Sequence, residues 1–149
     1  MNIPYDLFTE AFLAKITEYD LLSLDEPTRG AIVDGFMKRA LVPFRKNCKY
    51  DLFGTQDDDA RAFSVEIPEE DLYEILDIIS EGMIVQWLKP YVYKQELLEN
   101  VLNTKDFSTF SPAELLLRVS DTYAKSQKDY TNMIREYSYN HGDLTDLHI

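Results

Sequence analysis

The chain has 149 residues, of which 45% are hydrophobic and 13% aromatic, and its formal net charge is −12. This length is typical of one domain with a substantial core, and the composition excludes a chain that is disordered throughout. No apolar run approaches the length of a membrane span, and the N-terminus lacks the basic and apolar regions of a signal peptide. Cys48 is the single cysteine, so no intrachain disulfide can form, and we expect an intracellular site of synthesis.

Two amphipathic helices are predicted in the first third of the chain. The first begins after Pro4, and its apolar stripe consists of Leu7, Phe8, Ala11 and Phe12. The second covers about residues 26–46, and its apolar stripe recurs at every fourth residue, at Ile32, Phe36, Ala40 and Phe44. Pro43 should kink this second helix or shorten its end, because proline cannot donate a backbone hydrogen bond.

Residues 47–67 are expected to be largely irregular. Asp57, Asp58 and Asp59 are three adjacent acids in a turn-rich loop, which could suggest a calcium site. They lack the alternating acids, the glycine and the terminal glutamate of an EF-hand loop, so we predict no metal site there. Further along, Phe63, Val65 and Ile67 alternate with polar residues, which indicates a short strand or an extended segment.

A third helix is predicted from Pro68 to Lys89–Pro90, with acids in its first turn that suit the positive end of the helix dipole. Its apolar stripe consists of Leu72, Ile75, Leu76, Ile79, Met83 and Trp87. Four acids share another side of the helix and are expected to form an exposed acidic face: Glu70, Glu74, Asp77 and Glu81. A short fourth helix is predicted near residues 94–103.

The last helix is predicted from Pro112 to about Tyr139, with Ser111 as its N-cap. Residues 116, 119, 123, 126, 130, 133 and 137 form a heptad stripe of Leu, Val, Tyr, Ser, Tyr, Met and Tyr, which is typical of a packing seam. The preceding loop, residues 103–110, carries two aromatic residues, Phe107 and Phe110. They either tuck back onto the fourth helix or contact a neighbouring protein.

The expected architecture is all-α: a small bundle of four to five helices with a long C-terminal helix and an extended C-terminal tail. Residues 1–139 would form the helical domain, and residues 140–149 the tail. The only histidines are His141 and His148, both in that tail, and no phosphate-binding loop, nucleophile elbow or zinc motif occurs. We therefore expect a protein without catalytic residues, metal or cofactor.

The charges are unevenly distributed along the chain. Residues 27–50 carry six cations and one acid, whereas residues 51–86 carry one cation and eleven acids. Two interpretations stay open: these are solvated faces, or the basic side of one copy contacts the acidic side of the next in a head-to-tail ring. Under the second interpretation Lys38 and Arg39 contact the neighbouring copy. The net acidity argues against sequence-independent binding of nucleic acid.

Four segments carry a resemblance to a known family: Tyr5–Thr9, Gly82–Pro90, Leu102–Pro112 and Ile134–Tyr139. In these segments the chain resembles the head–tail connector proteins of long-tailed bacteriophages, also called adaptor or head-completion proteins. The resemblance implies a structural virion protein that is made in the host cytoplasm and forms a ring, usually dodecameric, in the neck. The ring would bind the portal protein and the next neck or tail protein, and DNA would pass through its channel without specific binding.

The resemblance also implies that a C-terminal extension reaches the portal, and its residues here would be Tyr139, His141, Leu144, Leu147 and Ile149. An acid-lined channel would repel phosphate and let the genome pass. The alternative is a generic helical protein–protein interaction module or regulator, also without enzymatic activity. A ring former should self-associate or assemble on a portal, whereas a regulator should be a monomer or dimer.

Overall fold

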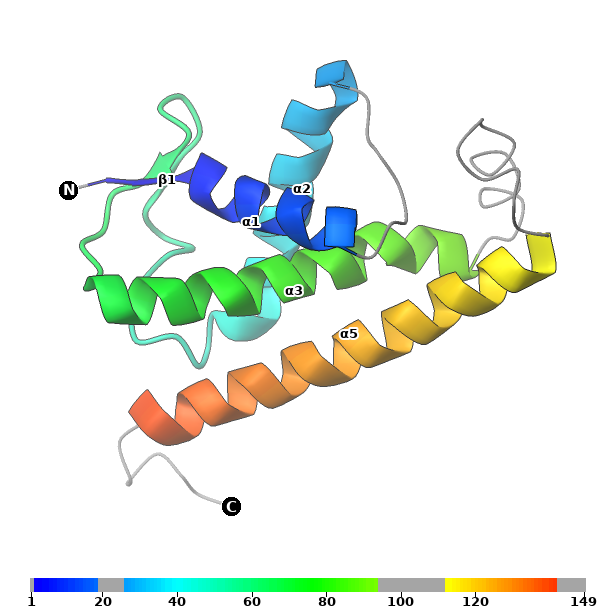
Figure 1. Ribbon diagram of the computed structural model, residues 1–149. Helices are drawn as coiled ribbons and strands as arrows, with labels where there is room; N and C mark the ends of the chain where they lie inside the picture. Colours follow the sequence, from blue (N-terminus) through cyan, green and yellow to red (C-terminus); the bar gives the residue numbers. More distant parts are fainter. Residues whose placement is uncertain (1, 19–25, 94–111, 142–149) are drawn as a thin grey trace.

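The computed structural model of the protein describes residues 2–18, 26–93 and 112–141. They form the helices α1 (Tyr5–Glu18), α2 (Glu26–Phe44), α3 (Glu69–Tyr93) and α5 (Pro112–His141), and the short strands β1 (Ile3–Pro4), β2 (Gln56–Asp57) and β3 (Ala62–Phe63). Helix α3 lies in the middle, with α1 and α2 on one side and α5 on the other (Figure 1). The architecture is mostly helical, as predicted. The predicted helix at 94–103, the loop at 103–110 and the tail after His141 lie outside the described residues.

Helix α3 is buried on nearly all sides through its middle turns. From Ile78 to Leu88 every residue except Gln86 is buried, because helices pack against it from two directions. The indole ring of Trp87 is fully buried and meets the ring of Phe12 edge-on, at 5.9 Å between centroids. A helix that is apolar all round has to be covered in this way, so α3 is the central element of the fold.

Helix α3 also continues further than the sequence indicated. It passes Pro90 and ends at Tyr93, whereas the predicted end was Lys89–Pro90. Pro90 is exposed and lies in the last turn, where few backbone hydrogen bonds of the helix remain to be disturbed. The proline therefore does not stop the helix.

Two residues that were expected in apolar stripes are exposed. On α1 the buried side consists of Tyr5, Phe8, Phe12 and Ile16, whereas Leu7 is 36% exposed. On α2 Ile32 is 42% exposed, although Phe36, Ala40 and Phe44 are buried as predicted. Each step of four residues turns about 40° beyond a full turn, so Ile32 lies about 120° around the helix from Phe44. Helix α2 ends at Phe44, directly after Pro43, which agrees with the predicted shortening.

The heptad stripe of α5 faces the body of the protein at every described position. Val119, Ser126, Tyr130 and Tyr137 are buried, and Tyr123 and Met133 are partly buried against the core. The tyrosine hydroxyls reach backbone partners: Tyr130 donates to the carbonyl of Ala40, and Tyr137 accepts the N–H of Lys49 at 3.1 Å. The spacing thus predicted the packing seam correctly, and the hydroxyls tie α5 to α2 and to the chain that follows it.

The small sheet fastens the N-terminus to the loop between α2 and α3. Its strands are antiparallel in the order β1-β3-β2, with Ile3 and Gln56 on either side of Phe63. The buried ring of Phe63 lies 4.8 Å from that of Tyr5 and 5.4 Å from that of Phe8. The extended segment predicted at Phe63–Ile67 is a strand only at its first residue, because β1 and β2 are each two residues long.

Helices α2, α3 and α5 approach most closely at Gly82. A Cβ atom at this position would lie 2.6 Å from Cε1 of Tyr130 and 3.0 Å from Cβ of Ala40. The Tyr130 ring cannot easily withdraw, because it is buried and its hydroxyl is bonded to the carbonyl of Ala40. The contact between the three helices therefore requires glycine.

We predict that Gly82→Ala destabilises the protein by about 1–3 kcal/mol, since overpacking forces neighbouring atoms to shift. The matched control is Gly35→Ala, because a Cβ at Gly35 meets no described atom within 4 Å. That change should stabilise the protein by about 0.4–1 kcal/mol through the unfolded chain and helix propensity. Chemical denaturation measures both effects, and equal effects would contradict the close contact at Gly82.

Candidate functional site

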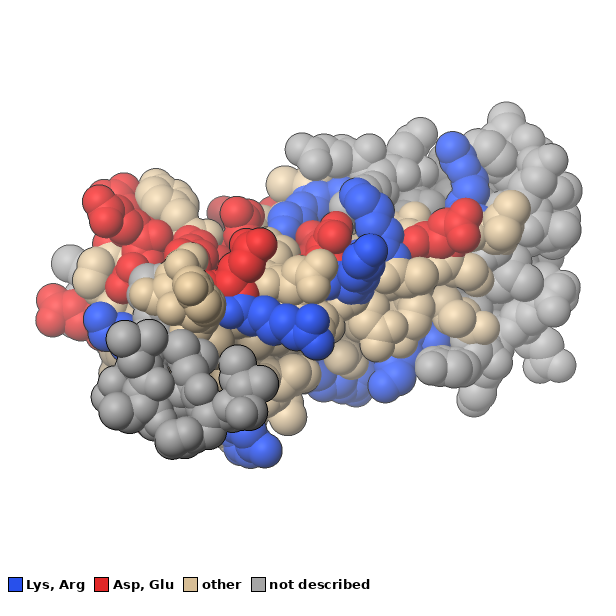
Figure 2. Space-filling model, turned by 90° about the horizontal axis from the view of Figure 1, so that it is seen from below, with Lys and Arg blue, Asp and Glu red and all other residues tan. Residues whose placement is uncertain are grey.

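Charge is segregated in space as well as along the sequence. The exposed acids of the loop and of the first turns of α3 are Asp51, Asp57, Asp58, Asp59, Glu66, Glu69, Glu70 and Asp77. Exposed cations at and after the end of α2 are Arg39, Arg45, Lys46 and Lys49. Figure 2 shows a cluster of acidic atoms at the end of the molecule where α3 begins, and basic atoms across its middle with further acidic atoms among them. The subunit therefore presents an acidic end, and most of its exposed cations lie away from that end.

The structure separates Lys38 from Arg39, the two cations predicted to contact a neighbouring copy. The ammonium of Lys38 lies 2.8 Å from Oδ1 of Asp58, so this charge is already paired within the chain. Arg39 is exposed, and it forms no ion pair within the described part of the chain. Of the two, Arg39 is the cation that is available to a partner.

Asp58 fastens the loop to both α1 and α2. Besides Lys38, its Oδ1 accepts a hydrogen bond from the Tyr5 hydroxyl at 2.8 Å. The hydrogen bonds from Lys38 and Tyr5 lower the pKa of Asp58 below its ordinary value of 3.8. Burial and the bond to Asp58 raise the pKa of Tyr5. Among the three adjacent acids, Asp58 is thus a structural anchor, and Asp57 caps the turn by accepting the N–H of Ala60 at 3.2 Å.

Arg61 is a second anchor of the same loop, and the sequence analysis did not identify it. Its guanidinium donates to both oxygens of Asp34, at 2.7 and 2.9 Å, and to Asp6 at 2.8 Å. These bonds, the one to Asp34 first, raise the pKa of Arg61. Its φ of 50° lies in the left-handed region, which costs a non-glycine residue about 1–2 kcal/mol, and its carbonyl accepts the N–H of Tyr5 at 2.8 Å. The one sequence feature that pointed to a structural role for Arg61 is that it is the single cation among the eleven acids of residues 51–86.

One of the four acids predicted to line an exposed face is buried. Glu70 and Asp77 are exposed and Glu74 is half-buried, but Glu81 is only 6% exposed. All four share one side of α3, and α1 covers that side at the level of Glu81. The ammonium of Lys15 on α1 lies 3.2 Å from Oε2 of Glu81. This ion pair joins α1 to α3, so the exposed acidic face ends at Asp77.

Two of the residues predicted to bind the portal, Tyr139 and His141, lie in the last turn of α5. Tyr139 is 75% exposed in the last turn, and His141 is the last residue of the helix. Leu144, Leu147 and Ile149 lie outside the described residues, as do Phe107 and Phe110. Just before Tyr139, the hydroxyl of Ser138 bonds to Oδ1 of Asn47 at 2.9 Å. The tail therefore starts from a fixed point on the surface.

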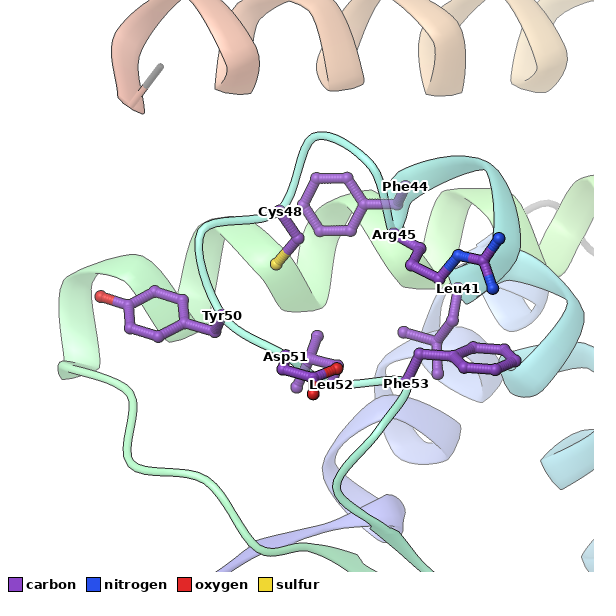
Figure 3. Close-up of a pocket in the computed structure, with 8 residues that line it drawn as sticks. All are labelled: Leu41, Phe44, Arg45, Cys48, Tyr50, Asp51, Leu52 and Phe53. Carbon is purple, nitrogen blue, oxygen red and sulfur yellow. The ribbon is translucent and has the colours of Figure 1, made fainter. Parts of the chain in front are cut away.

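A small cavity lies between the end of α2 and the following loop (Figure 3). Its lining residues are Leu41, Phe44, Arg45, Cys48, Tyr50, Asp51, Leu52 and Phe53. The Arg45 guanidinium carbon lies 5.0 Å from the centre of the Phe53 ring, and burial raises the pKa of the Cys48 thiol. Tyr50 donates to Asp71 at 2.5 Å, which raises its pKa to about 12. The cavity has room for about one water molecule, and the raised pKa keeps the Cys48 thiol protonated. We therefore interpret it as a small gap in the packing rather than as a binding site.

We predict that Asp58→Asn lowers the thermal stability of the protein at neutral pH. The pKa of Asp58 is lower in the folded protein than in the unfolded chain, so its ionised form stabilises the fold at pH values above the unfolded pKa. This stabilisation is lost as the pH falls through the folded-state pKa, below about 4. The difference between variant and wild type should therefore shrink in acid. Asp59→Asn, which removes the same charge from the adjacent exposed residue, is the control; a pH-independent deficit in Asp58→Asn would contradict the role of the charge.

Comparison of the chain with family models, with curated proteins and with solved structures finds no match. In the ranges that the structure describes, no group of three or more His, Cys, Asp or Glu side chains could hold a metal ion. No helix in those ranges is long and apolar enough to cross a membrane. The acidic end, the exposed cations that lie away from it and the fixed start of the tail are thus the features from which a function can be inferred.

Proposed function

We propose that the protein is a structural subunit of a bacteriophage neck, a head–tail connector whose copies form a ring between the portal and the next neck or tail protein. The observation that carries the proposal is the spatial separation of charge on one small helical body. Together with the resemblance of four segments to connector proteins, this separation supports assembly rather than chemistry. The proposal assigns the chain no catalytic residue, no metal and no cofactor.

Opposite charges at separate places favour a head-to-tail contact between identical subunits. Such a contact is heterologous, and it closes into a ring if the rotation from copy to copy divides a full turn. Complementary potentials raise the association rate and fix the register of the contact. The exposed acids around the start of α3 and the exposed Arg39 supply the two signs of charge.

The overall acidity supports the second part of the role, an extension of the channel for DNA. A net charge of −12 disfavours the binding of phosphates, so DNA would pass through the channel without specific contacts. In this proposal Phe107 and Phe110 contact a neighbouring subunit or the next component of the neck. The residues from Tyr139 to Ile149 contact the portal.

The start of the tail suits a portal anchor. Helix α5 is held at its end by the buried ring of Tyr137, which meets Phe44 at 4.9 Å, and by the bond between Ser138 and Asn47. The three apolar residues of the tail, Leu144, Leu147 and Ile149, are too few to form a core of their own. Contact with a partner would cover them and offset the entropy lost on ordering.

We predict that deletion of Asp143 to Ile149 abolishes binding to the portal but changes the melting temperature by no more than about 2 °C, because the described core ends at Tyr137. Cosedimentation of the purified protein with portal rings measures binding, and calorimetry measures stability. Tyr139→Ala should weaken binding without unfolding the protein. Undiminished docking of the truncated chain would place the anchor in the helical body.

The same measurements separate this role from that of a helical regulator. A connector binds portal rings and, in electron micrographs, adds a layer of density beneath them. A protein that stays a monomer or dimer and ignores the portal, with or without its tail, would overturn the connector proposal. That result would favour the generic interaction module.

A further inference from the structure

Helix α2 has an outward face that no other described part of the chain covers. Its members recur at steps of three or four residues, and we call them the α2 outer face: Ile32, Gly35, Arg39, Val42 and Pro43. Ile32 and Val42 are 42% and 47% exposed, so two branched apolar side chains flank the guanidinium of Arg39. Lys38 is not a member, because it is turned toward Asp58.

No contact within the described chain explains why a glycine, Gly35, lies in the middle of this face. Glycine inside a helix costs about 1 kcal/mol relative to alanine. A Cβ here would meet no described atom within 4 Å, and no described glycine has a positive φ. Neither tight packing nor backbone conformation therefore demands glycine, in contrast to Gly82. The absence of a side chain is useful where another backbone approaches from outside.

The first turns of α3 carry a surface of complementary character. Glu70, Tyr73 and Asp77 lie on one side of the helix at steps of three and four residues, with Glu69 beside them. Tyr73 is 63% exposed, and its hydroxyl bonds to Glu69 at 3.2 Å, which holds the ring among the acids. This acidic stripe thus offers carboxylates to Arg39 and an aromatic ring to Ile32 and Val42.

We propose that the α2 outer face of one copy docks onto the acidic stripe of α3 of a second copy, with Gly35 at the point of closest approach. The inference rests on the proposed function as a ring former and deepens it by naming the two faces in contact. Charge complementarity selects the occupant: a face with one exposed guanidinium among apolar residues fits the acidic, aromatic stripe that every copy of this chain carries on α3. Arg39 pairs with Glu70 across the contact, since Asp77 already lies 4.0 Å from Lys15 within the chain.

The first test uses Gly35→Leu, which should affect the free subunit and the assembly in opposite directions. In the subunit it improves helix propensity and meets open space, so the melting temperature should rise. In the contact the added side chain blocks close approach, so self-association should weaken about tenfold or more. Ala124→Leu adds a side chain at an exposed position of α5 and is the matched control. Sedimentation velocity over a concentration series measures association.

The second test uses charge reversal. Arg39→Glu and Glu70→Arg should each suppress self-association at low salt, whereas Lys128→Glu, an equal change on α5, should not. An equimolar mixture of the first two variants should associate again, because Arg39 of one variant meets Glu70 of the other. A wild-type chain that stays monomeric at all concentrations overturns the inference, as does a Gly35→Leu or Arg39→Glu variant that associates like the wild type.

Binding to portal rings, measured in parallel, separates this inference from the proposed function. If the wild type self-associates through Gly35 and Arg39 but ignores the portal, the neck role fails and the contact stands. If the wild type binds the portal but its self-association does not depend on these residues, the contact fails and the neck role stands.

Discussion

The burial of α3 between Ile78 and Leu88, at every residue except Gln86, is the constraint on which the remaining structure depends. A helix in this situation needs partners all round it, and bonds stabilise its buried polar groups, although Nε1 of Trp87 has no partner among the described residues. Ser80 bonds back to the carbonyl of Asp77 at 3.1 Å, and Glu81 pairs with Lys15 on α1. The single glycine in the buried stretch, Gly82, admits the ring of Tyr130. The positions of α1, α2 and α5 follow from what α3 requires at each level.

Cations have two different uses in this molecule. Lys15, Lys38 and Arg61 are committed to carboxylates on other elements, and they join α1 to α3, α2 to the loop, and the loop to α1 and α2. Exposed pairs of this kind contribute little individually, but the bidentate bond of Arg61 to Asp34 has the geometry that contributes most. Arg39 forms no such pair with the residues that the structure describes, which is why the proposed contact between copies depends on it.

Local periodic patterns made much of the fold predictable. The heptad of α5 and the stripe of α3 repeat within one helix, so the sequence alone indicates which side is buried. The exposure of Ile32 follows from the drift of a four-residue repeat around α2, which the stripe alone did not take into account. The burial of Glu81 depends on the path of α1 and is not encoded within α3. The same holds for the candidate site. Lys38 and Arg39 are adjacent and chemically alike, and only the distant loop with Asp58 distinguishes them.

The length of α5 has a mechanical consequence. With 30 residues and a rise of about 1.5 Å per residue, it is a continuous rod about 45 Å long. The chain enters this rod at Pro112 and leaves it at His141, and the rod is packed against α3 along its described side. The segment before α5 and the segment after it are therefore attached to opposite ends of one rigid helix. A partner that pulls on one end displaces the other end by rigid-body motion, so strain can cross the subunit without unfolding any part of it.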